Sequence, residues 1–327
     1  MIRTHTIPCN LNRDVADSLN RESGRIYTQV LVSHWRAFRK KGVWISPYGA
    51  ERLNDYCNPD KALHAHTIDA AQQGFYKAVK TARAVCEIDP SARFPHGPKK
   101  FCTTIWKQTG IKRDGNRLSL SNGRGNAKVA IKLPDHLQDA LRILEVCLVY
   151  NKSSRHYQWY IVAEDGKQPQ VAPGNHTVSV DLGEIHPAVV GDEDAAVIVT
   201  CRERRHQMQG HAKRLARINQ AISRTTKGSR RNRKLRRARS RMIAKHNQVM
   251  RDMTHKISRE IVNVAVDLEA DTVVMGDIKD IADGVNFGKK NNQKISGWNH
   301  GKVRTYVTYK AEAAGIETVL QDEHYTS

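Results

Sequence analysis

The segment HTVSVDLGEIHPAVVGDEDAAVIVT, residues 176–200, decides the fold of the C-terminal half of the chain. Its first part, HTVSVDLG, is an apolar strand that ends in an acid. Its second part, AVVGDEDAAVIVT, is an apolar return that turns at residues 191–194. Apolar runs bounded by turn residues are typical of strands, and we predict a β-hairpin over 176–200.

The stretch that follows, residues 202–259, holds about twenty Lys and Arg against two acids, Glu203 and Asp252. Apolar residues recur through it at helical spacing, and Lys227-Gly228-Ser229 interrupts them. We therefore predict two helices that form a basic hairpin. We predict a strand for TVVMGDI at 272–278 and a helix for residues 298–314. A third strand is predicted for IETVLQDE at 316–323. This order predicts an α/β unit with a mixed sheet.

The N-terminal part, residues 1–170, has a different pattern. Asn12 and Asp14 can cap a helix that runs toward Trp35, and a second helix is predicted over 61–86. Prolines and glycines then break the helical pattern, and strands are predicted at 144–149 and 159–163. A small β-domain interrupted by helices describes this part of the chain.

Charge and composition narrow the partners. The chain has 327 residues with 54 Lys and Arg against 33 acids, a net charge of +21. Such an excess indicates a polyanionic partner, nucleic acid before an anionic membrane. No stretch approaches the ~18 apolar residues of a spanning helix, and the N-terminus lacks the apolar core of a signal peptide. We expect a cytoplasmic, nucleoid-associated protein.

Six cysteines include no C-x-x-C pair, so no zinc-site spacing is visible. They are expected to be free thiols in a reducing compartment. Asp181, at the end of its strand and before Leu182-Gly183, is the candidate ligand for a divalent ion. A strand-end Asp taken by itself is more often a turn residue than a metal ligand.

Four segments together resemble one known family, the TnpB proteins of bacterial insertion sequences, relatives of the type V CRISPR effectors. They are SVDLGEIHPAVV at 179–190, KGSRRNRKLRRARSRMIAKH at 227–246, NVAVDLEADTVVMGDIKDI at 263–281 and residues 287–327. The match of residues 11–31 and of FPHGPKKF is looser. The resemblance implies a wedge-like β-barrel over 1–170 with an inserted helical recognition lobe at about 12–88. It also implies an RNase H-like (RuvC-type) domain over 171–327, truncated at its C-terminus, with the basic helical hairpin at 202–268 as an insertion.

The resemblance also implies partners: one guide RNA per protein, derived from a transposon end or similar, and target double-stranded DNA that the guide reads by base pairing. No membrane is involved. The expected RNA- and DNA-binding residues are Lys213, Arg214, Arg217, Arg230, Arg231, Arg233, Lys234, Arg236, Arg237, Arg241 and Lys245. The expected contacts to the short flanking DNA motif are Gln72, Gln73, Tyr76, Lys77, Lys99 and Lys100.

The chain departs from the pattern of this family at two places that concern the nuclease site. The family places a catalytic Glu where this chain has Gly276, and Asp277 should face the other side of its strand. Some relatives use a later glutamate, which would be Glu323 here, so Asp181 and Glu323 are the expected catalytic and metal-binding pair of an incomplete site. The family also continues beyond the position of Ser327 into a zinc element and a last catalytic Asp. Mg²⁺ would be required only if the site is active.

Three functions follow from these features. The first is RNA-guided DNA binding without cleavage, as a transcriptional repressor similar to nuclease-inactive TnpB-like proteins. The second is an RNA-guided DNA endonuclease, or a shortened form of one, that uses Asp181 and the relocated Glu323. The third is nonspecific RNA binding.

Overall fold

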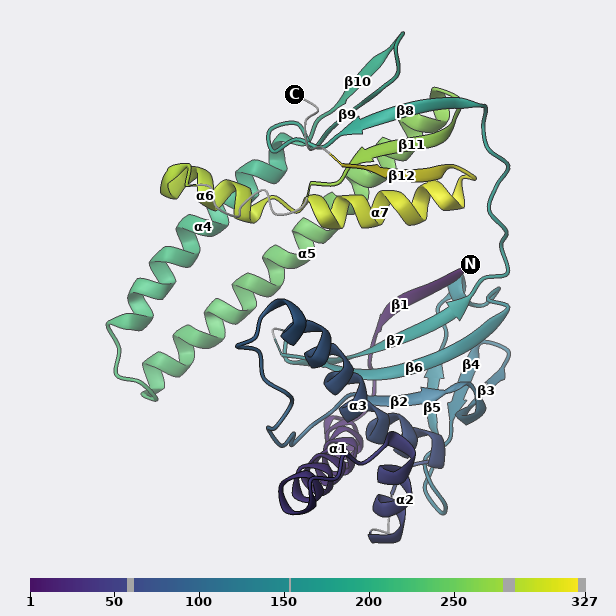
Figure 1. Cartoon of the computed structure of the whole chain (residues 1–327), viewed down its shortest axis with the longest axis vertical. Helices are drawn as coiled ribbons and strands as arrows, with labels where there is room; N and C mark the ends of the chain where they lie inside the picture. The colour runs from purple at the N-terminus through teal and green to yellow at the C-terminus, as the bar shows by residue number, and fades with distance from the viewer. Residues whose placement is uncertain (58–61, 153, 279–285, 323–327) are drawn as a thin grey trace. The chain divides into compact units, whose positions relative to one another are not determined.

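The computed structural model describes residues 1–57, 62–152, 154–278 and 286–322. The chain forms two compact units, Met1–Lys167 and Gln168–Ser327 (Figure 1). In the described part of the chain, no helix has the length and apolar character needed to cross a membrane.

Unit 1 holds two antiparallel sheets. One has the strand order β1-β7-β6-β2, with β1 at Ile2–Pro8, β7 at His156–Glu164, β6 at Arg142–Asn151 and β2 at Thr104–Lys107. The other joins β3 (Ile111–Asp114), β4 (Arg117–Leu120) and β5 (Val129–Lys132). Trp106 and Trp159, with ring centroids 5.9 Å apart, belong to one core that also takes in Leu118 and Ile131 of the smaller sheet. Two short 3-10 turns, Gln108–Gly110 and Asp135–Leu137, lie between the strands.

The expected β-barrel is not found among the described strands of unit 1. Its seven strands pair into two separate sheets, and neither sheet closes on itself. β1 and β2 each have one strand neighbour and form the edges of the larger sheet. The short strands of the second sheet instead pack their apolar side chains against the larger sheet.

Three helices lie between β1 and β2 in sequence: α1 (Arg13–Lys41), α2 (Pro47–Cys57) and α3 (Ala65–Ile88). The predicted cap is confirmed, because the Asn12 side chain accepts from the Asp14 backbone N–H at 2.8 Å. α1 extends beyond Trp35 to Gly42, whose φ of 65° ends it in the left-handed conformation that favours glycine. α2 was not predicted, because it spans only 11 residues.

Unit 2 contains the predicted mixed sheet, with strand order β10-β9-β8-β11-β12. β8 (His176–Asp181), β9 (Ala188–Gly191) and β10 (Ala196–Val199) are antiparallel neighbours, so residues 176–200 form three strands rather than a two-stranded hairpin. The turn at Gly191–Asp194 joins the second pair. β11 (Ala270–Gly276) is parallel to both β8 and β12 (Glu317–Gln321).

Helices α4 (Arg202–Ser223) and α5 (Arg230–Asp267) form the predicted basic hairpin, with its turn at the expected residues. α5 packs only its C-terminal part in the core, through Ile257, Ile261 and Ala265. α7 (His300–Ala313) adds Val303 and Val307, and the sheet adds its apolar face. α6 (Gly288–Gly297) was not predicted, because its sequence has almost no apolar residues.

Lys310 is an unusual member of the α5–α7 contact. Its side chain is 5% exposed, and its ammonium donates to the His255 carbonyl at 2.6 Å and to the Ser258 hydroxyl at 2.7 Å. Burial, and then the nearby Arg259 charge, lowers the pKa of Lys310 to about 8. Keeping Lys310 protonated in the folded state therefore costs free energy, which lowers the stability of the fold.

This penalty predicts a specific pH dependence of stability. Below pH 8 Lys310 is protonated in both the folded and the unfolded state, and the full free-energy cost of burying its charge is present. Between pH 8 and the unfolded pKa near 10.4 the folded state loses its proton first, so the free energy of unfolding should rise by up to about 3 kcal/mol. Denaturant unfolding of Lys310→Met should lack this rise, whereas the exposed-lysine control Lys302→Met should keep it. Equal alkaline profiles for both variants would contradict the assignment.

Candidate nucleic-acid interface and catalytic centre

Asp181 lies on the solvent side of the sheet in unit 2. Side chains alternate along β8, so Val178 and Val180 are buried while Ser179 and Asp181 are exposed. Leu182, the next residue, returns to the core. The alternation places the Asp181 carboxylate at the end of the strand, where a divalent ion or a phosphate could reach it.

The parallel register places two further positions beside Asp181. Val180 lies opposite Met275 in β11, and Gly276 lies opposite Gln321 in β12. The next rung of the ladder therefore aligns Asp181, Gly276 and Gln321 on one face, with neighbouring strands about 4.8 Å apart. We call these three positions the strand-end rung. It contains one carboxylate, one position without a side chain and one neutral amide.

Asp277, the acid that follows Gly276, forms an ion pair with Arg304 of α7. Its backbone N–H donates to the Gln321 carbonyl at 2.7 Å, which extends the ladder past the strand-end rung. Glu323, the second expected catalytic and metal-binding residue, and Asp280 lie outside the described residues. Within the described ranges, no three His, Cys, Asp or Glu side chains lie close enough to hold a metal ion. The described residues at this edge do not fit a two-metal centre, which needs several carboxylates.

The eleven expected RNA- and DNA-binding residues all lie on α4 and α5, and all eleven side chains are exposed. Among the residues that the structure describes, none of them forms an ion pair with a carboxylate. Arg214 and Arg236 use one nitrogen each in a hydrogen bond within their own helix. These cations are thus free to contact a polyanion.

The turn of the hairpin is held by a buried asparagine, which orients the cations around it. Asn232 is 3% exposed, and its side-chain amide donates to Thr225 at 2.8 Å and accepts from Arg236 at 3.0 Å. Ser229 caps α5 by accepting from the Asn232 backbone N–H. Five cations line a surface depression here: Arg230, Arg231, Arg233, Lys234 and Arg237. The positive end of the α5 dipole adds to their charge.

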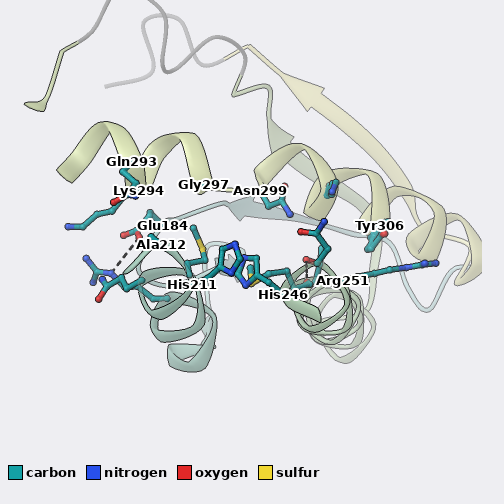
Figure 2. A pocket seen from close by; sticks show the side chains of 17 residues that line it. Glu184, His211, Ala212, His246, Arg251, Gln293, Lys294, Gly297, Asn299 and Tyr306 are labelled. Carbon is teal, nitrogen blue, oxygen red and sulfur yellow. Dashed lines mark hydrogen bonds and ion pairs between the residues drawn. The ribbon is translucent and has the colours of Figure 1, made fainter. Parts of the chain in front are cut away.

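A pocket of about 540 Å³ lies between α4, α5, α6 and α7 (Figure 2). His211 of α4 and His246 of α5 stack in it, with ring centroids 3.8 Å apart and planes 3° from parallel. Burial, followed by nearby positive charge, lowers the pKa of both histidines, which favours the neutral form of both rings. Sequence reasoning missed this pocket, because its residues come from four helices and the loops beside them and share no spacing.

The expected flanking-motif residues of unit 1 divide into two groups. Gln72 is 1% exposed and donates to Asp55, and Gln73 bonds Glu51 and Lys107. The Tyr76 hydroxyl donates to the Ile45 carbonyl, and burial raises the pKa of Tyr76 to about 12. These three side chains are occupied inside the unit.

Lys77, Lys99 and Lys100 are exposed. The segment that carries the last two is fixed to α1, because the Thr28 hydroxyl accepts from the Lys99 backbone N–H at 3.0 Å. Gly24 permits this contact, since a Cβ there would lie 2.7 Å from the carbonyl oxygens of Lys99 and Lys100.

The strand-end rung predicts a gain of metal binding. In Gly276→Glu a second carboxylate would lie one strand from Asp181, and two carboxylates hold a divalent ion better than one. We expect Mn²⁺, followed by electron paramagnetic resonance, to bind about tenfold more tightly than to the unaltered chain, and the gain to vanish when Asp181→Ala is added. Thr272→Glu, four residues earlier on the same strand face, is the control. Equal Mn²⁺ binding by the two Glu variants would show that the rung is not as described.

No curated protein sequence matches the chain at a significant level. The fold is similar to that of Cas12f1 in a cryo-EM structure of a Cas12f1–sgRNA–target DNA complex, with a TM-score of 0.66 and 12% identity over 97% of this chain and 75% of that one. A crystal structure of C2c1 of Alicyclobacillus acidoterrestris in complex with single-guide RNA gives a TM-score of 0.37 and 8% identity. The match covers 93% of this chain and 59% of that one.

A family model provides the remaining comparison. Residues 160–282 match the family described as "Probable transposase" (OrfB_IS605). The matched range contains β8, Asp181, the whole basic hairpin and the strand that ends in Gly276. The family match therefore falls on the mixed sheet and its basic insertion, and the fold of the chain is similar to that of Cas12f1.

Proposed function

We propose that this protein is an RNA-guided DNA-binding protein that holds its target without cutting it and acts as a transcriptional repressor. The observation that carries the proposal is the basic hairpin, whose eleven exposed cations lack carboxylate partners in the described part of the chain. Surfaces made only for solubility mix both signs of charge. A hairpin of one sign is suited to a phosphate backbone.

The partners in this proposal are one guide RNA and target double-stranded DNA. The Cas12f1 structure with a similar fold is a complex with sgRNA and target DNA, which supports this choice. Guide pairing would read the DNA sequence, and the hairpin would bind backbone phosphates of RNA and heteroduplex. Lys77, Lys99 and Lys100 remain the candidates for contacts to a flanking motif. Such a protein would work at the nucleoid in the cytoplasm.

The absence of cleavage is proposed from the strand-end rung. In-line attack on a phosphodiester by two metal ions needs carboxylates from several strands. Of the three aligned positions, only Asp181 supplies one, and Asp277 is engaged by Arg304. Loss of a metal-binding carboxylate removes several kcal/mol of transition-state stabilisation, so rates fall by orders of magnitude.

A guided endonuclease is the second candidate, and one observation favours it. β12 runs parallel to β11 and ends at Gln321, beside Gly276, and Glu323 follows two residues later in sequence. Asp181 and Glu323 would then be its metal-binding pair, with Mg²⁺ as the cofactor. Nonspecific RNA binding, the third possibility, differs in that DNA binding would ignore the guide.

We expect the hairpin to carry the salt dependence of RNA binding. Replacing Arg230, Arg231, Arg233, Arg236 and Arg237 with Gln should weaken binding for all RNA sequences. It should also flatten the slope of log affinity against log salt by roughly 0.7–0.9 per lost phosphate contact. The control replaces five exposed cations of unit 1, Lys112, Arg117, Arg124, Lys128 and Lys132, which changes the net charge equally. If both variants lower the slope by the same amount, the effect is global charge and the assignment of the hairpin is wrong.

One experiment tests both whether DNA binding depends on the guide RNA and whether the DNA is cleaved. The protein is expressed with the DNA that adjoins its gene, and the copurifying RNA is sequenced. The complex is then incubated in Mg²⁺ or Mn²⁺ with a plasmid that carries a matched target. We expect a footprint that moves when the guide segment is changed, and an intact plasmid.

Two outcomes would overturn parts of this proposal. Guide-dependent nicking that disappears in Asp181→Ala would establish the endonuclease. A footprint that stays in place after the guide is changed would remove RNA guidance altogether.

A further inference from the structure

We propose that the pocket between α4, α5, α6 and α7 binds a single extruded nucleotide of the RNA, with the base inside and the phosphate at the rim. This rests on the proposed function only in that RNA is the partner. The pocket is distinct from the strand-end rung and contains none of the eleven cations expected to bind RNA and DNA. Its volume, about 540 Å³, lies in the range of small-ligand pockets.

The interior offers flat, weakly polar surfaces to a planar ring. The neutral His211–His246 stack bridges the two arms of the hairpin (Figure 2). Tyr306 lines the α7 side and is fixed by stacking on His255, at a centroid distance of 4.2 Å. Met208 and Met250 add polarizable thioethers. Aromatic surfaces of this kind hold unstacked RNA bases.

Three amide side chains in the lining can read the edge of a base. Asn247, Gln293 and Asn299 line the pocket, and none of these side chains makes a hydrogen bond to another described residue. An amide presents both donors and an acceptor, which is the pattern that base edges require. A purely apolar ligand would leave these groups unpaired.

The charge of the rim selects an anion. Among the described residues, Glu184 is the only acid in the lining, and it lies 3.5 Å from Arg205 in an ion pair. Arg251, Lys294 and Lys302 also line the pocket, and none of the three has a carboxylate partner among the described residues. The surplus of positive charge disfavours a metal ion and favours a phosphate beside the base.

A free nucleotide and a nucleotide within a strand share this chemistry, and continuity with the hairpin favours the strand. Lys245 of the RNA-binding set is adjacent in sequence to His246, and Lys213 follows His211 by two residues. A backbone that follows these cations passes the rim of the pocket on the same two helices. Binding of a free nucleotide is therefore tested as a separate arm.

The proposal is tested by a substitution that places a large side chain in the pocket. Ala212 lines it, whereas Ala216, one turn further along α4, is exposed and does not. The full-length protein and the variants Ala212→Phe and Ala216→Phe are titrated with three probes. These are a single-stranded RNA of about 12 nucleotides, the blunt duplex of the same RNA, and free AMP and UMP. Asn247→Leu, which removes one amide at an exposed position, serves as a second variant that disturbs packing less.

We expect Ala212→Phe to weaken binding of the single-stranded RNA about tenfold, in line with the loss of one stacked base, and Asn247→Leu to weaken it less. Duplex binding should be unchanged, because its bases are not available, and Ala216→Phe should match the unaltered chain. Unchanged single-strand binding in both pocket variants would overturn the proposal. Loss of AMP and UMP binding alone would overturn the RNA assignment in favour of a free nucleotide.

These outcomes are distinguishable from failure of the proposed function. If the unaltered protein binds neither single-stranded nor duplex RNA, the RNA partner itself is wrong. If Ala212→Phe loses duplex binding as well, the effect of the substitution is not confined to the pocket, and the proposal falls unless Asn247→Leu shows the selective loss.

Discussion

Mutual repulsion between the cations of α4 and α5 is the constraint on which the rest of unit 2 depends. A helical hairpin with about twenty positive charges and two acids gains little from its own contacts. It is held because α5 is one helix of 38 residues whose C-terminal part buries Ile257, Ile261 and Ala265 in the core of the mixed sheet. The apolar half of the helix thus supports a charged half that the sheet does not cover.

The same anchoring explains where the polar exceptions occur. Asn232 is buried at the turn, where hydrogen bonds to Thr225 and Arg236 replace the packing that apolar residues would provide. Lys310 is buried where α7 meets α5, and it donates to a carbonyl and a hydroxyl of α5. The histidine stack lies between the arms, where neutral rings separate helices whose outer faces repel each other. Lys310 therefore joins α5 to α7, and the histidine stack joins α4 to α5.

The parallel register of β8, β11 and β12 determines which side chains can form a metal site, whereas the basic hairpin contributes no carboxylate to that site. It aligns residues 181, 276 and 321 on one face, so that a single position, Gly276, decides whether two carboxylates are neighbours. In the proposed function, binding of a polyanion would be distributed over many side chains of the hairpin, so the loss of one side chain would be tolerated. A metal centre depends on a few carboxylates, so the loss of one would not be tolerated. Binding and cleavage would therefore be separable.

The sequence by itself determined the elements whose signal is local. The charge of residues 202–259, the break at Lys227–Ser229 and the apolar runs around Asp181 predicted the basic hairpin and the mixed sheet, because helical periodicity and strand alternation are properties of neighbouring residues. The resemblance to TnpB proteins rested on the same segments. α2 and α6 escaped prediction because both are short, at 11 and 10 residues, and a short segment gives little helical periodicity.

Only the tertiary structure decided what depends on contacts between distant segments. It paired the seven strands of unit 1 into two open sheets in place of the expected barrel, and it buried Gln72 among internal partners. It also brought His211, His246 and Tyr306 to one pocket from three helices. Strand register and helix packing are set by long-range burial, and no spacing in the sequence records which residues will meet.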